Sequence, residues 1–373
     1  MSTADDRAAD RADESRTAGD RPAAESDPVR GRAQGRSAVP LSILDLAPVG
    51  VPTTPGEALT TTTELARAAE AWGYHRMWVA EHHGMPGIAS SSPSVVLAHL
   101  AAATSTIRLG SGGVMLPNHA PLVVAEQFGT LEALHPGRID LGLGRAPGTD
   151  QGTARALRRT TGSLSADDFP QQLGELLAFL GDGFPADHPY AEVQSVPHAG
   201  SPPVWLLGSS GFSAQVAGAL GLPFAFAHHF SAQNTLPALE LYRESFQPSS
   251  VLSEPYALIG VQAIAADTDQ AAYDLALPIA LSMLRLRKGE PGRLPSPEEA
   301  RAYPYDELER SFVDGWLADA VHGTPDRVEA GLEELRERTG ADELMLTANI
   351  YDRAAKLRSY ELIARRYELP GAR

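Results

Sequence analysis

From Leu41 onward, short apolar runs alternate with longer amphipathic stretches. A short apolar run is typical of a buried strand and an amphipathic stretch of a covering helix, so the alternation predicts βα units around a parallel sheet. Eight runs fit a strand: 41–46, 75–80, 106–110, 138–143, 203–208, 223–227, 256–265 and 342–348. Eight such units without an internal repeat predict a closed (β/α)8 barrel, the TIM-barrel architecture of the α/β class.

Helix signals lie between these runs. The helical pattern of 56–72 ends at Gly73, a residue suited to the left-handed position that closes a helix. Thr324 and Pro325 supply an N-cap and first-turn pair for a helix over 325–338. These signals support the predicted alternation.

Two segments depart from the alternation. Residues 1–38 hold eight Asp or Glu, seven Arg and almost no large apolar side chain, which predicts a disordered tail before a single barrel domain over 39–373. Residues 288–320 carry four prolines among charged residues. This pattern predicts an insertion after the seventh strand, at the carboxyl end of the barrel, where it is either a lid or a surface excursion without a role.

Charge and composition exclude several classes of function. The net charge is −16, of which the tail contributes −1, and this acidity argues against a nucleic-acid partner. No run approaches the roughly 18 apolar residues of a membrane span and no secretory signal is visible, so we expect a cytoplasmic protein without a membrane partner. The absence of cysteine excludes disulfides, thiolate metal sites and a cysteine nucleophile.

Candidate chemistry gathers where the predicted strands end. The second strand runs into Glu81, His82 and His83, where a histidine is able to exchange a proton near neutral pH or simply belongs to a hydrogen-bonded loop. Gly112 and Gly113 follow the third strand, and glycines there let the backbone approach a flat ligand.

The fourth and fifth strands end in segments suited to an anion. Arg145 lies in 142–147 (GLGRAP), which fails the dinucleotide fingerprint because proline occupies the third glycine position. The segment 208–213 (GSSGFS) leads into a helical stretch over 214–220, so its free N–H groups and hydroxyls either bind an anion or form an ordinary serine cap. It does not match the nucleophile motif G-x-S-x-G.

The remaining histidines give little sign of a metal. His228 and His229 follow the sixth strand and either line the same mouth or cap it. Neither H-x-H nor H-E-x-x-H occurs, and we predict no metal site.

Six segments occur in the order found in one family: 81–83 (EHH), 116–121 (LPNHAP), 135–138 (HPGR), 143–145 (LGR), 204–210 (VWLLGSS) and 322–325 (HGTP). Together they make residues 39–365 resemble the bacterial-luciferase-like flavin monooxygenases, in their single-polypeptide form. The resemblance implies a barrel that holds reduced FMN at its carboxyl end, with the flavin supplied by a separate reductase.

The resemblance also assigns roles to individual residues. It makes Arg145 the holder of the FMN phosphate, and His82 the catalytic histidine with His83 or His228 as neighbours. It places a non-prolyl cis peptide at Gly112 and Gly113 beneath the flavin ring. The residues assigned to the phosphate loop are Gly208, Ser209, Ser210 and Ser213.

The function implied is a monooxygenase in which reduced FMN reacts with oxygen to a 4a-hydroperoxyflavin that oxygenates a small organic substrate. We also expect a homodimer. Three alternatives stay open: a deazaflavin-dependent oxidoreductase that transfers hydride, a non-catalytic flavin-binding protein, and a metal-assisted hydrolase. The sequence does not name the substrate.

Overall fold

Eight parallel strands close into a barrel in the computed structural model, which describes residues 29–146, 148–158, 168–198 and 200–372. The barrel closes because the last strand pairs with both the first and the seventh. In order around the barrel the strands are β1 (Leu41–Asp45), β2 (Arg76–Val79), β3 (Arg108–Ser111), β5 (Ile139–Gly144), β6 (Val204–Gly208), β7 (Phe224–Phe226), β8 (Ala257–Ala265) and β10 (Glu343–Thr347). All eight predicted strands and the predicted fold class are confirmed.

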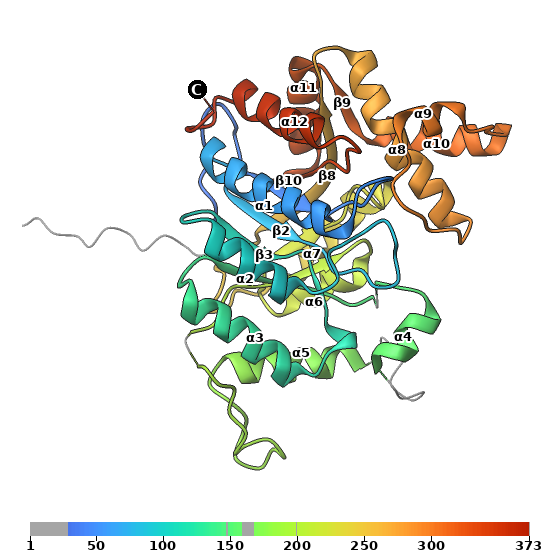
Figure 1. The fold of residues 1–373 in the computed structure, drawn as a ribbon. Coiled ribbons are helices and arrows are strands. Elements are labelled where there is room, and N and C mark those ends of the chain that lie inside the picture. Colours follow the sequence, from blue (N-terminus) through green and yellow to red (C-terminus); the bar gives the residue numbers. More distant parts are fainter. Residues whose placement is uncertain (1–28, 147, 159–167, 199, 373) are drawn as a thin grey trace, which may run out of the picture.

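Helices surround the barrel on its outer side (Figure 1). They are α1 (Pro55–Trp72), α2 (Pro93–Ala103), α3 (Pro121–Leu134), α4 (Gln151–Arg158), α5 (Phe169–Leu180), α6 (Gly211–Ala219), α7 (Thr235–Ser245), α8 (Asp269–Arg287), α9 (Pro297–Ala302), α10 (Glu307–Asp319), α11 (Pro325–Thr339) and α12 (Arg353–Arg366). Short elements are β4 (Val114–Met115), β9 (Val321–Gly323) and the 3-10 turns η1 (Leu116–Asn118) and η3 (Ala232–Asn234). The sequence pattern predicted neither β4 nor β9.

The helix ends follow the local signals. Thr54 and Glu57 form a capping box at the start of α1, and Gly73 ends it with φ 88°, a conformation that favours glycine. Thr324 is the N-cap of α11 and Pro325 its first residue. The helix predicted over 214–220 begins earlier, at Gly211, and is α6.

Each strand divides its side chains between two apolar layers. In β1, Leu41 and Ile43 pack outward against the helices, whereas Leu44 belongs to a second cluster inside the barrel. That inner cluster also contains Trp78 and Trp205, whose rings meet edge to face with centroids 5.2 Å apart. Because side chains fill the barrel, an opening for a ligand exists only toward its ends.

A buried ionic network fills the amino-terminal end of the barrel. The guanidinium of Arg76 lies 2.9 Å from both Asp140 Oδ2 and Glu343 Oε1, and none of the three side chains is exposed. Trp78 Nε1 donates to Asp140 and the Tyr256 hydroxyl donates to Glu343. Each buried charge therefore has an opposite charge and further hydrogen-bond partners.

The boundary predicted for the disordered tail needs a correction. Residues 29–38 lie against the amino-terminal end of the barrel: Val29 is 1% exposed, its carbonyl accepts from Arg76 Nη2, and the Gly31 N–H donates to the Tyr256 hydroxyl. Backbone hydrogen bonds, which composition does not reveal, hold this segment. The rest of the predicted tail, residues 1–28, lies outside the described residues.

The segment predicted as an insertion, 288–320, follows α8 and contains α9 and α10. After it, β9 pairs with the carboxyl-terminal end of β8, and Leu294 forms a bridge with Gly50 beyond the end of β1. These contacts place the segment at the carboxyl end of the barrel. Both alternatives for it, a lid and a surface excursion without a role, stay open.

Candidate functional site

A cavity of about 270 Å³, here called the mouth cavity, opens where the strands end at the carboxyl side of the barrel. Parallel strands bring their following loops to one rim, which is why residues far apart in sequence meet there. Seven of the predicted site residues line the mouth cavity: His82, Gly112, Arg145, Gly208, Ser209, Ser210 and Ser213. Two predicted residues, His83 and Gly113, are not among those that line it.

One end of the mouth cavity combines a positive side chain with the start of a helix. Arg145 follows β5, and its guanidinium carbon lies 4.4 Å from the ring centroid of Phe212 in the first turn of α6. Among the described residues it forms no ion pair. The N-cap of α6 is Ser210, whose side chain makes no capping hydrogen bond. A positive side chain and the free N–H groups of a nine-residue helix therefore face the same space.

Glycines form a smooth part of the wall. A Cβ at Gly112 would come within 2.8 Å of Leu44 Cδ1, and one at Gly208 within 2.8 Å of Ser213 Cβ. The peptide between Gly112 and Gly113 is cis, which confirms the expected non-prolyl cis bond. Gly112 and Gly208 therefore leave no room for a side chain, and each presents only backbone to the cavity.

His82 reaches the cavity from the loop after β2. Its Nδ1 lies 3.3 Å from the Gly148 carbonyl, and because a carbonyl only accepts, Nδ1 carries the hydrogen. Burial lowers the pKa of His82, so the ring is neutral at pH 7 and its Nε2 keeps a lone pair. The lone pair is able to accept a proton.

A second histidine, His229, lines the same cavity. Its Nδ1 lies 2.9 Å from the Gly260 carbonyl, and burial lowers its pKa to about 4. His229 is therefore also neutral, with Nε2 free of a proton. The sequence singled out the pair 228–229 but favoured His228, because only the folded register shows which member of a consecutive pair faces inward.

His83 lies behind the cavity instead of inside it. Its Nε2 and that of His119 both lie 2.8 Å from Glu81 Oε1, and Glu81 Oε2 accepts from the Met115 N–H. Burial alone would raise the pKa of Glu81, but the hydrogen bonds outweigh burial and hold it below its usual value. Glu81 thus ties the loops after β2 and β3 together, and His83 serves this anchor.

A second cavity of about 170 Å³, here called the apolar cavity, adjoins the first. Leu46, His82, His229 and Phe230 line both cavities, so the two histidines lie at their junction. The segment 288–320 contributes Leu294 and Trp316 to its wall. A ligand in the apolar cavity would therefore lie beside one in the mouth cavity.

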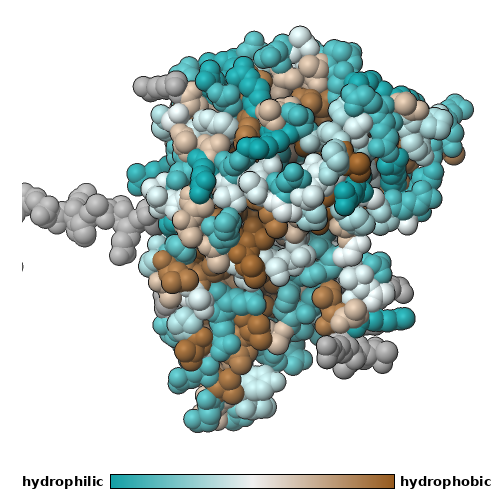
Figure 2. All heavy atoms as spheres, viewed as in Figure 1, coloured by the Kyte–Doolittle hydropathy of each residue, from teal (hydrophilic) through white to brown (hydrophobic). Residues whose placement is uncertain are grey.

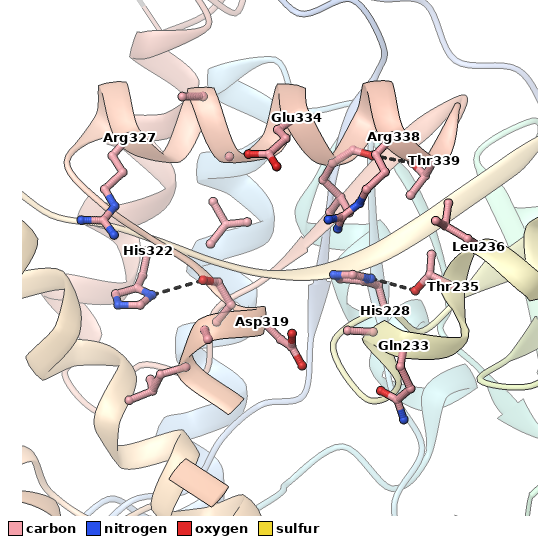
Figure 3. Close-up of a pocket in the computed structure, with 18 residues that line it drawn as sticks. His228, Gln233, Thr235, Leu236, Asp319, His322, Arg327, Glu334, Arg338 and Thr339 are labelled. Atoms are coloured by element: carbon pink, nitrogen blue, oxygen red, sulfur yellow. Dashed lines mark hydrogen bonds between the residues drawn. The ribbon is translucent and has the colours of Figure 1, made fainter. Parts of the chain in front are cut away.

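A larger cavity, of about 730 Å³, lies elsewhere (Figure 3). It is an outer groove between α11, the end of α10 and the residues around η3, and charged side chains such as Arg327 and Glu334 surround it. His228 points there and its Nδ1 lies 2.8 Å from Thr235 Oγ1. Size alone does not mark the site, because none of the predicted cofactor residues lines this groove, whereas most of them line the mouth cavity.

Two features are absent from the described residues. No helix there has the length and apolar content to cross a bilayer. No group of three or more histidine, aspartate or glutamate side chains is arranged to hold a metal ion within the described part of the chain.

A closed barrel of eight parallel strands, with a cavity at the carboxyl ends of the strands, makes the protein a TIM-barrel protein. Residues 39–343 match the model of the luciferase-like monooxygenase family. The chain belongs to this family, as the sequence resemblance indicated.

Close relatives support the assignment. The chain is 52% identical to YvbT of Bacillus subtilis (strain 168), with 87% of this chain and 95% of the relative covered. It is 48% identical to a luciferase-like monooxygenase of Escherichia coli (strain K12), with 87% and 96% covered. The crystal structure of apo-MsnO8 superposes with a TM-score of 0.80 at 38% identity and covers 89% of this chain and 98% of its own.

More distant structures share the fold alone. The oxygenating constituent of 3,6-diketocamphane monooxygenase, in complex with FMN, has a TM-score of 0.67 at 20% identity. A coenzyme F420-dependent tetrahydromethanopterin reductase from Methanopyrus kandleri has a TM-score of 0.59 at 16% identity. The fold therefore accommodates both FMN and F420, and fold alone does not choose between them.

Proposed function

We propose that the protein is a monooxygenase that uses reduced FMN and oxygen to oxygenate a small organic substrate. The observation that carries the proposal is the mouth cavity, whose anion-binding end and backbone wall fit a phosphorylated flavin. Arg145, which forms no ion pair with any described residue, lies beside the uncapped start of α6, and this is the strongest part of that fit.

Bound in this cavity, FMN would supply the reaction with oxygen. Arg145 and the N–H groups of α6 would hold the phosphate, with the hydroxyls of Ser209 and Ser210 beside them. Gly112 leaves room for the ring, and apolar neighbours such as Leu44 and Trp78 exclude water from it. His82, with its lone pair on Nε2, would accept a proton at the junction of the two cavities.

The deciding experiment is an anaerobic titration of the full chain with reduced FMN, reduced FAD and reduced deazaflavin, followed by mixing with oxygen. We expect reduced FMN to bind, and its reaction with oxygen to release peroxide more slowly than free FMN does. Binding of deazaflavin alone would move the assignment to hydride transfer. Flavin binding without any effect on peroxide release would favour a non-catalytic flavin-binding protein.

The role of His82 has a separate test. The variant His82→Ala should lower oxygenation by about 10²-fold or more, the usual contribution of a positioned acid or base. Its affinity for FMN should change little, and the matched variant His83→Ala should retain more activity because His83 does not line the cavity. Unchanged turnover in His82→Ala would remove His82 from the mechanism.

The proposal includes two protein partners. A separate flavin reductase supplies the reduced cofactor, and a second copy of the chain forms a homodimer. Hydrophobic residues gather on the face over α2 and α3 (Figure 2), where Val95 and Leu134 are 67% and 64% exposed. Such a patch is typical of an interface. Light scattering should give twice the monomer mass, and Val95→Glu should reduce it.

A further inference from the structure

Three polar atoms in the wall of the apolar cavity have no hydrogen-bond partner among the described residues. They are Gln262 Nε2, Asn349 Oδ1 and Ser282 Oγ, and each atom is buried. The side chains of Gln262 and Asn349 belong to residues only 3% and 7% exposed. Buried polar atoms are nearly always paired in folded proteins, so three unpaired ones around one cavity point to a missing ligand group.

These atoms reach the cavity from three different elements. Gln262 lies on β8 two residues after Gly260, so it faces the barrel interior as Gly260 does. Asn349 follows β10. Ser282 lies on the face of α8 that also presents Ile279 and Met283 to the cavity. Convergence from a strand, a loop and a helix is a property of the folded barrel.

The remaining wall of the apolar cavity lacks charge. Its residues are chiefly hydrophobic, among them Ile88 and Leu294, and none of the described lining residues is an aspartate, glutamate, lysine or arginine. Its two histidines have lowered pKa values because of burial. A charged group placed here would lose its hydration without gaining an opposite charge.

The size of the apolar cavity limits the ligand. An apolar protein cavity of about 150 Å³ is known to accept benzene, and this one has about 170 Å³. One end adjoins the mouth cavity at His82 and His229. A small ring or a short branched chain therefore fits, with one end directed toward the junction.

We propose that the apolar cavity is a substrate site for an uncharged, mainly hydrocarbon molecule whose polar group is hydrogen-bonded by Gln262 and Asn349. An amide N–H of Gln262 donates to the group, and Asn349 Oδ1 accepts from it, so the group both accepts and donates, as a carboxamide or a hydroxyl does. The inference rests on the proposed function, because it makes this molecule the one that is oxygenated.

The test measures binding to the full chain saturated with FMN. Four probes of one size are compared by ligand-observed NMR titration: benzamide, benzyl alcohol, toluene and benzoate. We expect benzamide or benzyl alcohol to bind about 10-fold more tightly than toluene, the effect of two added hydrogen bonds, and benzoate to bind most weakly. Equal affinities, tightest binding of benzoate, or no binding of any uncharged probe at millimolar concentration would overturn the proposal.

Variants locate the preference. The variants Gln262→Leu and Asn349→Leu should each bind toluene as tightly as the native protein does. Their preference for the polar probe over toluene should fall to about 3-fold, because one of the two hydrogen bonds is lost. The matched control is Thr347→Val: Thr347 pairs with Gln262 in register and also has a buried unpaired hydroxyl, but it does not line the cavity. An equal loss of preference in Thr347→Val would overturn the proposal. If a leucine variant fails to fold, the affinities of the four probes for the native protein still decide it.

The outcome also separates this inference from the proposed function. A clear preference for the polar probe, without any effect of the protein on flavin oxidation, would support the proposed binding site and contradict the proposed monooxygenase activity. Flavin-dependent oxygen consumption without a preference for the polar probe would support the monooxygenase activity and contradict the proposed binding site. If only water pairs the three atoms, toluene and benzamide will bind equally.

Discussion

The two ends of the barrel treat buried polar groups in opposite ways. At the amino-terminal end, Arg76 is paired with Asp140 and Glu343, and tyrosine and tryptophan side chains complete the network. At the carboxyl end, Gln262 and Asn349 each have a buried atom without a partner in the described part of the chain. Unpaired buried groups lower stability, and the two at the carboxyl end face a cavity, so a ligand there is able to pair them.

The difference is not simply one of charged against neutral residues. Glu81 lies at the carboxyl end, yet it is fully paired with His83 and His119 and fixes the loops around the mouth cavity. Pairing therefore distinguishes groups that support the structure from groups that await a ligand, even within one rim. Arg145, stacked on Phe212 without an ion pair among the described residues, is of the second kind.

The largest expected effect comes from breaking the paired end. Arg76→Met removes the cation between Asp140 and Glu343 and leaves both carboxylates buried without it, so unfolding free energy should fall by about 3–5 kcal/mol. Urea unfolding measures the change. As a control, Arg353→Met removes an exposed pair with Glu64 and should cost less than about 1 kcal/mol. Similar losses in both variants would contradict the contrast between the ends.

The unpaired end should respond in binding instead of stability. Arg145→Met should raise the dissociation constant of FMN by about 100-fold, the loss expected for charge-assisted bonds to a phosphate. Riboflavin, which lacks the phosphate, should bind the variant and the native protein alike. The unfolding midpoint without flavin should move little, and a large drop would mean that Arg145 is structural.

The neutral His229 at the junction of the two cavities should make the stability of the fold depend on pH in the acid range. The pKa of His229 is about 4 in the folded protein against 6.5 for an unperturbed histidine, so between these values the unfolded chain binds a proton that the folded protein does not. Stability is therefore lost as pH falls from 6.5 to 4, by up to about 1.4 kcal/mol per pH unit. His229→Gln should flatten this slope in urea midpoints measured across the range, whereas replacing the exposed His99 should not.

The smallest effect concerns the support of Arg145. Phe212→Leu removes the ring beneath the guanidinium, an interaction worth about 0.5–1 kcal/mol at an exposed site. The dissociation constant of FMN should rise about 2–5-fold, again without a change for riboflavin. An effect as large as that of Arg145→Met would mean that Phe212 contacts the flavin itself.

Much of the fold was readable from the sequence because strands of a barrel are buried on both faces. A strand buried on both faces has a continuous apolar sequence, such as 256–265, whichever strands it pairs with. Candidate residues of the site were readable for a related reason: polar residues and glycines directly after such runs, including His82 and Arg145, must lie at one rim of a parallel barrel.

The sequence by itself therefore determined the eight strands, the candidate site residues that follow them, and the end of the barrel at which the mouth cavity opens. Only the tertiary structure decided that His229 faces inward and His228 outward, and that residues 29–38 pack on the barrel. It also decided that Gln262 Nε2 and Asn349 Oδ1 are buried without a partner among the described residues. A local pattern records how much surface each residue buries. Whether a buried polar atom is paired depends on groups brought from distant parts of the chain, which no local pattern contains.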